Sequence, residues 1–142
     1  MAARDAVSAQ GPRGTIEPSV QIAFPAGEYI GVARLVAGGV ATRLDFGFEA
    51  VDDLQLAIET VLRAAFAPAA QATMRIASDG GSLAVSIGPV DASALGRLLY
   101  GARGTEGIEL GALLAQLVDG VAAQPEPVPS IVLRIDSAGR SA

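Results

Sequence analysis

The stretch DDLQLAIETVLRAAF, residues 52–66, decides the fold of this chain. Its apolar residues recur at spacings of three and four, so the pattern predicts a helix from about residue 49 to residue 66. Acidic residues in the first turns oppose the positive end of the helix dipole, and Pro68 prevents the helix from continuing. The residues predicted to face the core are Val51, Leu54, Ile58, Val61 and Ala65.

The preceding stretch, GEYIGVARLVAGGVATRLDF at residues 27–46, predicts a second helix over residues 28–44. Gly38 and Gly39 weaken this helix, each by roughly 1 kcal/mol relative to alanine. The apolar positions at helical spacing, and therefore the expected core face, are Tyr29, Ala33, Val36, Val40 and Leu44.

Strands are predicted on both sides of these helices, because apolar and polar residues alternate there with a period of two. The turn residues Asp79, Gly80 and Gly81 lie between two such segments and are typical of a tight hairpin. The expected strands cover residues 19–24, 72–77, 82–88 and 130–136.

The second half of the chain carries two further helical patterns. Asp91 is expected to cap a short helix that ends near Tyr100, and Thr105 to cap a longer helix over residues 107–122. The resulting element order is β-α-α-β-β-α-α-β. This order predicts an α+β fold, a two-layer α/β sandwich in which helices cover one face of a mostly antiparallel sheet.

The length of 142 residues suits a single domain. We expect a flexible N-terminal arm over residues 1–17, the domain over residues 18–137 and a tail over residues 138–142. Only 4% of the residues are aromatic, so the core must consist mainly of aliphatic side chains. Its expected large pieces are Phe24, Tyr29, Phe46, Phe48, Phe66 and Tyr100.

Composition excludes several classes of function. Cysteine and histidine are both absent, which removes thiolate chemistry, the commonest metal ligand and any Ser-His-Asp triad. The formal net charge is -5 and the arginines are scattered along the chain, so no nucleic-acid surface is expected. The most apolar run is too short to span a bilayer and is interrupted by Arg34, so we expect a cytoplasmic protein without membrane contact.

Residues 27–46 and 52–66 together resemble the front half of the RsbW-like anti-sigma factors, which are serine-protein kinases of the GHKL superfamily. The resemblance extends over roughly residues 19–136 and implies a histidine-kinase-like ATPase fold. In that family the second helix carries a Glu-x-x-x-Asn motif. Aligned on the Asp-Asp-Leu-x-x-Ala pattern that begins at residue 52, the motif's Glu falls on Thr60 and its Asn on Ala64.

Neither residue can perform the role that the resemblance assigns to its position. Thr60 is no carboxylate base, and Ala64 has no oxygen for magnesium. A register shifted by one residue would put Glu59 at the base position, but Arg63 would then repel the metal. The alternative interpretation of Glu59 and Arg63 is an exposed i, i+4 ion pair.

The other nucleotide-binding elements of the family are also altered. The segment around Gly88 lacks the aspartate that would accept a hydrogen bond from adenine. The Gly-x-Gly element that opens the last long helix is kept only in part, because Glu109 precedes Gly111 where glycine is expected. The Gly-Thr pair that enters the last strand is reduced to Ser130.

The resemblance together with these losses predicts a bacterial transcription regulator of the anti-sigma-factor type, with a degenerate ATP site, that acts by protein-protein binding. Its expected partner is a sigma factor or a STAS-type anti-anti-sigma protein, with a homodimer as a further arrangement. No catalytic residue, metal or cofactor is expected. The helix over residues 28–44 and its glycine pair are candidate contact surfaces, or an ordinary core-packed helix.

Two alternatives remain open. The first is a divergent serine-protein kinase that binds ATP and magnesium and phosphorylates an anti-anti-sigma partner. Its nucleotide-binding residues would be Gly88, Gly107, Gly111 and Ser130. The second is a domain that binds another small ligand in the vacated nucleotide pocket, whose expected lining is Val61, Ala64, Ile87 and Leu110.

Overall fold

The computed structural model describes residues 19–99 and 106–137 of the chain. The strands are β1 (Ser19–Pro25), β2 (Gln71–Asp79), β3 (Ser82–Gly88), β4 (Gly120–Gln124) and β5 (Ser130–Asp136). The helices are α1 (Ile30–Arg43), α2 (Phe48–Ala65), α3 (Ala92–Leu99) and α4 (Glu106–Leu117).

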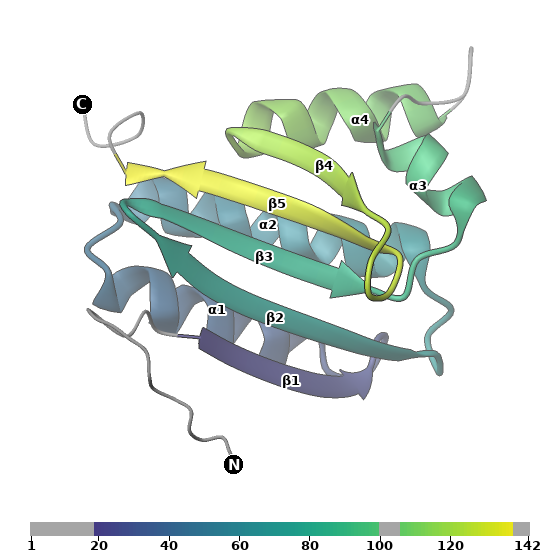
Figure 1. Cartoon of the computed structure of the whole chain (residues 1–142), viewed down its shortest axis with the longest axis horizontal. Helices are drawn as coiled ribbons and strands as arrows, with labels where there is room; N and C mark the ends of the chain where they lie inside the picture. Colours follow the sequence, from purple (N-terminus) through teal and green to yellow (C-terminus); the bar gives the residue numbers. More distant parts are fainter. Residues whose placement is uncertain (1–18, 100–105, 138–142) are drawn as a thin grey trace.

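The strands form one five-stranded sheet in the order β1-β2-β3-β5-β4, and every neighbouring pair is antiparallel. Helices α1 and α2 lie behind the sheet in the view of Figure 1, while α3 and α4 pack beside α2 and against β4. The predicted α+β class, with an antiparallel sheet and helices on one side, is therefore confirmed.

The hairpin between β2 and β3 forms as the sequence predicts. Gly80 and Gly81 both have positive φ angles, 56° and 98°, which residues with a Cβ atom rarely adopt. Such a pair matches the right-handed twist of the flanking strands. The turn fixes the register of the hairpin, in which Ile76 lies opposite Val85 and Met74 opposite Ile87.

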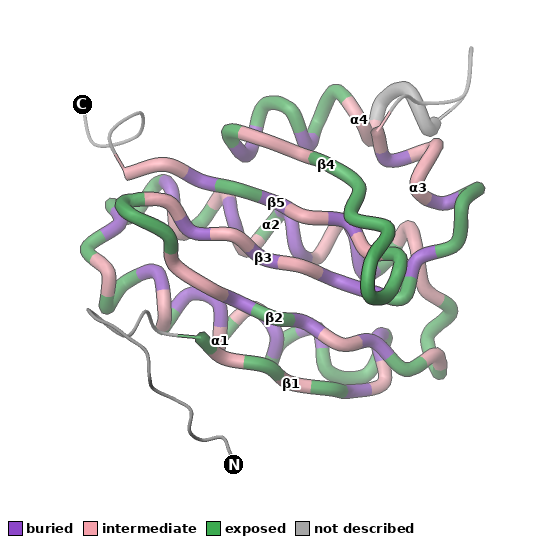
Figure 2. The backbone as a smooth tube through the Cα atoms, viewed as in Figure 1, coloured by how far each residue is buried: buried purple, intermediate pink, exposed green. Residues whose placement is uncertain are grey.

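The core lies between the inner face of the sheet and the helices. Alternate residues of the inner strands are buried, and the intervening ones face the open, outer side of the sheet (Figure 2). The helices supply mostly alanine and leucine to this core. The largest fully buried side chains are Leu54, Ile58, Leu62, Met74, Ile76, Leu83, Ile87, Leu98, Leu114, Ile131, Leu133 and Ile135.

One predicted element is wrong. The sequence predicts a helix over residues 107–122, but α4 ends at Leu117 and residues 120–124 form the edge strand β4. Val121 has helical spacing from Leu117, yet it lies opposite Leu133 of β5. The backbone groups of residues 120–124 form hydrogen bonds with β5 in place of the hydrogen bonds of a longer helix. Gly120 also disfavours continuation of the helix.

The predicted core face of α1 is also partly wrong. Small residues face the core, since the buried positions are Ile30, Ala33, Ala37, Gly38 and Ala41. Val36 and Val40 are only half-buried, and Tyr29 is 45% exposed. Phe48, expected in the core, is 89% exposed at the start of α2. Small side chains therefore occupy most of the buried positions of α1, and the two valines pack at the edge of the core.

Helix α1 ends in a hydrogen-bonded turn that explains its length. Asp45 has a φ of 66°, and its N–H donates to the carbonyl of Thr42 at 3.0 Å. The N–H of Phe46 donates to the carbonyl of Ala41 at 3.1 Å, which completes a Schellman motif. This turn reverses the chain and directs α2 back along α1.

Several predictions fall outside the described residues: the arm over residues 1–17, the tail over residues 138–142, the Thr105 cap and the end of a helix at Tyr100. Among the helices that the structure does describe, none combines the length and the apolar character needed to cross a membrane.

Candidate functional site

Thr60 and Ala64, the degenerate base and metal-ligand positions, lie one turn apart on α2. The Thr60 hydroxyl donates to the carbonyl of Leu56 at 2.8 Å, so it is held against the helix backbone. Ala64 packs against the core with its methyl group, and its carbonyl accepts a hydrogen bond from Nη2 of Arg97 on α3 at 3.3 Å. Both positions therefore serve helix structure and packing.

Glu59, the base position in the shifted register, is engaged by two arginines. Nε of Arg63 lies 2.9 Å from Oε2 of Glu59, which confirms the predicted i, i+4 ion pair. Nη1 of Arg34, from α1, lies 3.2 Å from Oε1. The sequence did not predict this second contact, which ties α1 to α2. Both carboxylate oxygens of Glu59 are therefore engaged in ion pairs within the protein.

Gly111 lies in the middle of α4, where it faces the end of α3. A Cβ atom at this position would lie 3.4 Å from the carbonyl oxygen of Leu98 and 3.6 Å from that of Leu99. The glycine therefore permits close packing of the two helices. Gly107 lies in the first turns of the same helix.

Gly88 and Ser130 meet at one end of the sheet, where β3 and β5 lie side by side. The Ser130 hydroxyl donates to the carbonyl of Val128 at 2.8 Å. A Cβ atom at Gly88 would collide with the Ser130 hydroxyl and would lie 2.8 Å from the carbonyl oxygen of Pro129. Their side-chain positions belong to the outer face of the sheet, whereas Thr60 and Ala64 belong to α2 behind it and Gly111 to α4, which packs beside α2.

The structure thus brings two of the predicted nucleotide-binding residues together and separates them from the others by the sheet. The lining expected for a vacated pocket is largely closed. Val61 and Ile87 are completely buried, as is the neighbouring Leu62, while Ala64 and Leu110 are half-buried.

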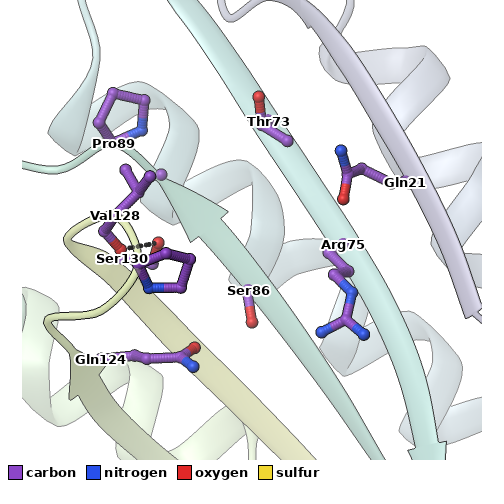
Figure 3. Close-up of a pocket in the computed structure, with 10 residues that line it drawn as sticks. Gln21, Thr73, Arg75, Ser86, Pro89, Gln124, Val128 and Ser130 are labelled. Carbon is purple, nitrogen blue, oxygen red and sulfur yellow. Dashed lines mark hydrogen bonds between the residues drawn. The ribbon is translucent and has the colours of Figure 1, made fainter.

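A pocket of about 650 Å³ opens on the outer face of the sheet, and we call it the sheet pocket. The loop between β4 and β5 rises over one end of the sheet and forms one wall (Figure 1). Figure 3 shows the side chains of three strands pointing into this space from the floor. Its lining residues are Gln21, Thr73, Arg75, Ser86, Gly88, Pro89, Gln124, Pro127, Val128 and Ser130.

Among the described residues of this lining, Arg75 is the only charged one. It lies opposite Gln21 of β1 and opposite Ser86 of β3. The three side chains form a polar row across the sheet, with Arg75 in the middle. Within the described residues its guanidinium group has no hydrogen-bond or ion-pair partner. Pro89 and Val128 lie on the other side of the pocket (Figure 3), and together with Pro127, which also lines it, they form an apolar wall.

Sequence reasoning missed most of these lining residues. The signal was present in the strand alternation, because Gln21, Thr73 and Arg75 occupy the outward positions of β1 and β2. The pairing of β5 with β3, and of β4 with β5, brings Ser130 and Gln124 to the same end of the sheet. That pairing joins distant parts of the chain, and local patterns do not reveal it.

A second exposed surface lies on α1, formed by Tyr29, Val32 and Leu35, and we call it the α1 surface. These side chains are 45%, 46% and 73% exposed. Gly31 and Gly39 lie on the same side of the helix, and a Cβ atom at either would meet no other atom within 4 Å. Helix α1 therefore presents apolar and small residues to solvent on the side opposite the core.

No group of three or more acidic side chains that could hold a metal ion occurs in the described part of the chain. Glu59, Asp136 and Asp91 each have partners within the protein instead. Oδ1 of Asp91 accepts a hydrogen bond from the N–H of Ala94 at 2.8 Å, which confirms the predicted cap of α3.

Comparison with known proteins gives one short similarity. No protein-family model matches the chain. A segment of 35 residues is 46% identical to part of the serine-protein kinase RsbW of Oceanobacillus iheyensis. The match covers 25% of this chain and 22% of that relative's length. It supports a relation to this kind of protein over a limited part of the sequence.

Proposed function

We propose that this chain is a regulatory protein of the anti-sigma-factor type that acts by binding another protein and transfers no phosphate. The observation that carries the proposal is the state of α2. At the two positions that the resemblance assigns to phosphotransfer, Thr60 bonds to its own helix and Ala64 packs against the core. Glu59, which precedes Thr60 in the sequence, forms ion pairs with Arg34 and Arg63.

The α1 surface is the proposed contact region. Leu35 is its most exposed member, and burying such a side chain at an interface contributes on the order of 1.5–3 kcal/mol. Val32 lies one turn before it, so the two side chains together present a continuous apolar strip. Exposed apolar side chains gathered on one face are typical of a protein-binding site.

The proposed partner is a sigma factor or a STAS-type anti-anti-sigma protein, as expected for a relative of RsbW. The local similarity to an RsbW protein supports this choice. A second copy of the chain is the alternative occupant of the same surface, and measurement of the molecular mass in solution separates the two.

Nucleotide binding is tested by isothermal titration of the chain with ATP and magnesium. We expect no binding in the micromolar range, because the chain offers neither the base nor the metal ligand of the family. Micromolar affinity together with transfer of phosphate to a serine of the partner would establish the kinase alternative instead.

Partner binding is tested by affinity purification from the source cell, followed by mass spectrometry and by titration of the purified partner. We expect a sigma factor or a STAS protein, and we expect Leu35→Asp to weaken its binding by about tenfold or more. Leu113→Asp is the matched control, since Leu113 is also exposed but lies on α4. Equal binding by both variants would contradict the role of the α1 surface.

A further inference from the structure

The sheet pocket lies on the face of the sheet away from the helices, so it is separate from both the α1 surface and the degenerate positions of α2. Its volume, about 650 Å³, lies within the usual range for pockets that bind small molecules. From its shape and its charges, we propose that it binds a small organic anion, with a carboxylate or phosphate group on Arg75 and an apolar body against the proline-rich wall.

The positive charge of Arg75 favours an anionic ligand. Of the lining residues that the structure describes, Arg75 alone has a formal charge and none is a carboxylate. In the described residues, nothing in the protein neutralises its guanidinium group. A planar guanidinium binds carboxylate and phosphate oxygens in a bidentate manner.

The polar neighbours of Arg75 can donate hydrogen bonds to the same anionic group. Thr73 and Ser86 offer hydroxyl groups, and Gln21 offers a side-chain amide (Figure 3). Gln21 and Ser86 lie directly opposite Arg75 on the two adjacent strands. A ligand oxygen on the guanidinium group would therefore find hydrogen-bond donors on both sides of it.

The apolar wall opposite Arg75 favours an apolar body for the rest of the ligand. Pro89, Pro127 and Val128 present rings and methyl groups, and Ser130 is already bonded to the Val128 carbonyl. An apolar body such as an aromatic ring packs on this wall without leaving polar groups unpaired. Glu126 belongs to the same loop but is not among the described lining residues.

The test is a two-dimensional NMR titration of the labelled chain with three probes of similar shape: benzoate, phenyl phosphate and the neutral benzamide. We expect at least one of the two anions to shift the amide signals of Thr73, Arg75, Ser86 and Gln124 at concentrations up to about 10 mM. Benzamide should bind at least about tenfold more weakly, because it lacks the charge that Arg75 recognises. The stronger of the two anions identifies carboxylate or phosphate as the preferred group.

Arg75→Gln should weaken binding of the anion by about tenfold or more, and Arg75→Lys should restore part of the loss. Arg43→Gln is the matched control, because it removes the same charge from an exposed position at the end of α1. The native spectrum of each variant shows that it is folded. Equal binding of benzamide and the anions, unchanged affinity in Arg75→Gln, or no shifts with either anion would overturn the proposal.

Binding of a second copy of the chain to this face would also overturn the proposal of a ligand site. If the protein dimerises in solution through β1 and β2 and the anions are excluded, the sheet pocket is an interface and no ligand site. Analytical ultracentrifugation at the NMR concentration gives the oligomeric state. Failure here would leave the α1 surface and the proposed partner binding untouched, because they lie on the other side of the molecule.

Discussion

Asp136, at the end of β5, is held by a small polar cluster at the edge of the hairpin. The Ser82 hydroxyl donates to Oδ1 of Asp136 at 2.6 Å, and Nε of Arg134 lies 3.1 Å from the same oxygen. The hydrogen bond from Ser82 and then the contact with Arg134 hold the pKa of Asp136 below its ordinary value. These side chains lie on the outer face and join β3 to β5.

This lowered pKa predicts how stability depends on pH. The unfolded-state pKa of an aspartate is about 3.9, and the folded-state value is lower, so the folded protein favours the ionised carboxylate. The contribution to stability is therefore complete above the unfolded-state pKa and is lost as the pH falls through the folded-state pKa. Ser82→Ala should raise the pKa of Asp136, which NMR titration of its carboxyl carbon measures.

Ser93→Ala is the matched control for this experiment, since it removes an exposed hydroxyl group from α3. The pKa of Asp136 should be the same in this control and in the native chain. An unchanged Asp136 pKa in Ser82→Ala would contradict the role of the Ser82 hydrogen bond.

Local spacing predicted one ion pair of α2 and not the other. Glu59 and Arg63 are four residues apart on one helix, so the geometry of the helix alone places them together. Arg34 lies 25 residues from Glu59, and the contact depends on how α1 packs against α2. The same limit applies to Gly88 and Ser130, which meet only because β5 pairs with β3.

At the scale of elements, the two adjacent glycines of α1 have opposite surroundings. A Cβ atom at Gly39 would meet no other atom within 4 Å, so that position is open. A Cβ atom at Gly38 would lie 2.5 Å from Nε2 of Gln55 on α2. That amide donates to the carbonyl of Arg34 at 2.9 Å and so connects the two helices.

Gly39→Ala should therefore raise the free energy of unfolding by roughly 0.5–1 kcal/mol, because alanine loses less backbone entropy in a helix. Gly38→Ala should gain less or should destabilise the protein, since the new methyl group displaces the amide of Gln55 and breaks its hydrogen bond. Urea unfolding of the two variants beside the native chain measures the difference. Equal stabilisation by both would mean that Gln55 moves aside without cost.

Most elements follow from local patterns, and the failures share a cause. The hairpin of β2 and β3, the two front helices and β5 are all predicted, because their periodicities extend over whole elements. Strand β4 has only five residues, and its apolar members continue the helical spacing of α4. Whether these residues form a strand depends on pairing with the edge of β5 that does not pair with β3. The buried face of α1 depends likewise on how closely α2 and the sheet approach it.

At the scale of the whole molecule, the sheet divides two surfaces of different character. The inner face carries the apolar core, and the outer face carries the serine, threonine and glutamine side chains around Arg75. Sequence alternation assigns residues to faces, but it cannot order the strands. The sheet pocket requires the order β1-β2-β3-β5-β4, in which β5 lies between β3 and β4. A site lined by residues of all five strands and of the loop between β4 and β5 is therefore visible only in the folded chain.

The same strand order predicts a gradient of protection from hydrogen exchange. Strands β2, β3 and β5 have partners on both sides, so their amides should exchange only through large-scale unfolding. Strand β4 is paired on one side only, so its bonded amides should alternate with rapidly exchanging ones. A helix over residues 107–122 would instead protect successive amides through 122. NMR-detected exchange distinguishes these patterns, and uninterrupted protection from Leu117 to Ala122 would contradict the strand.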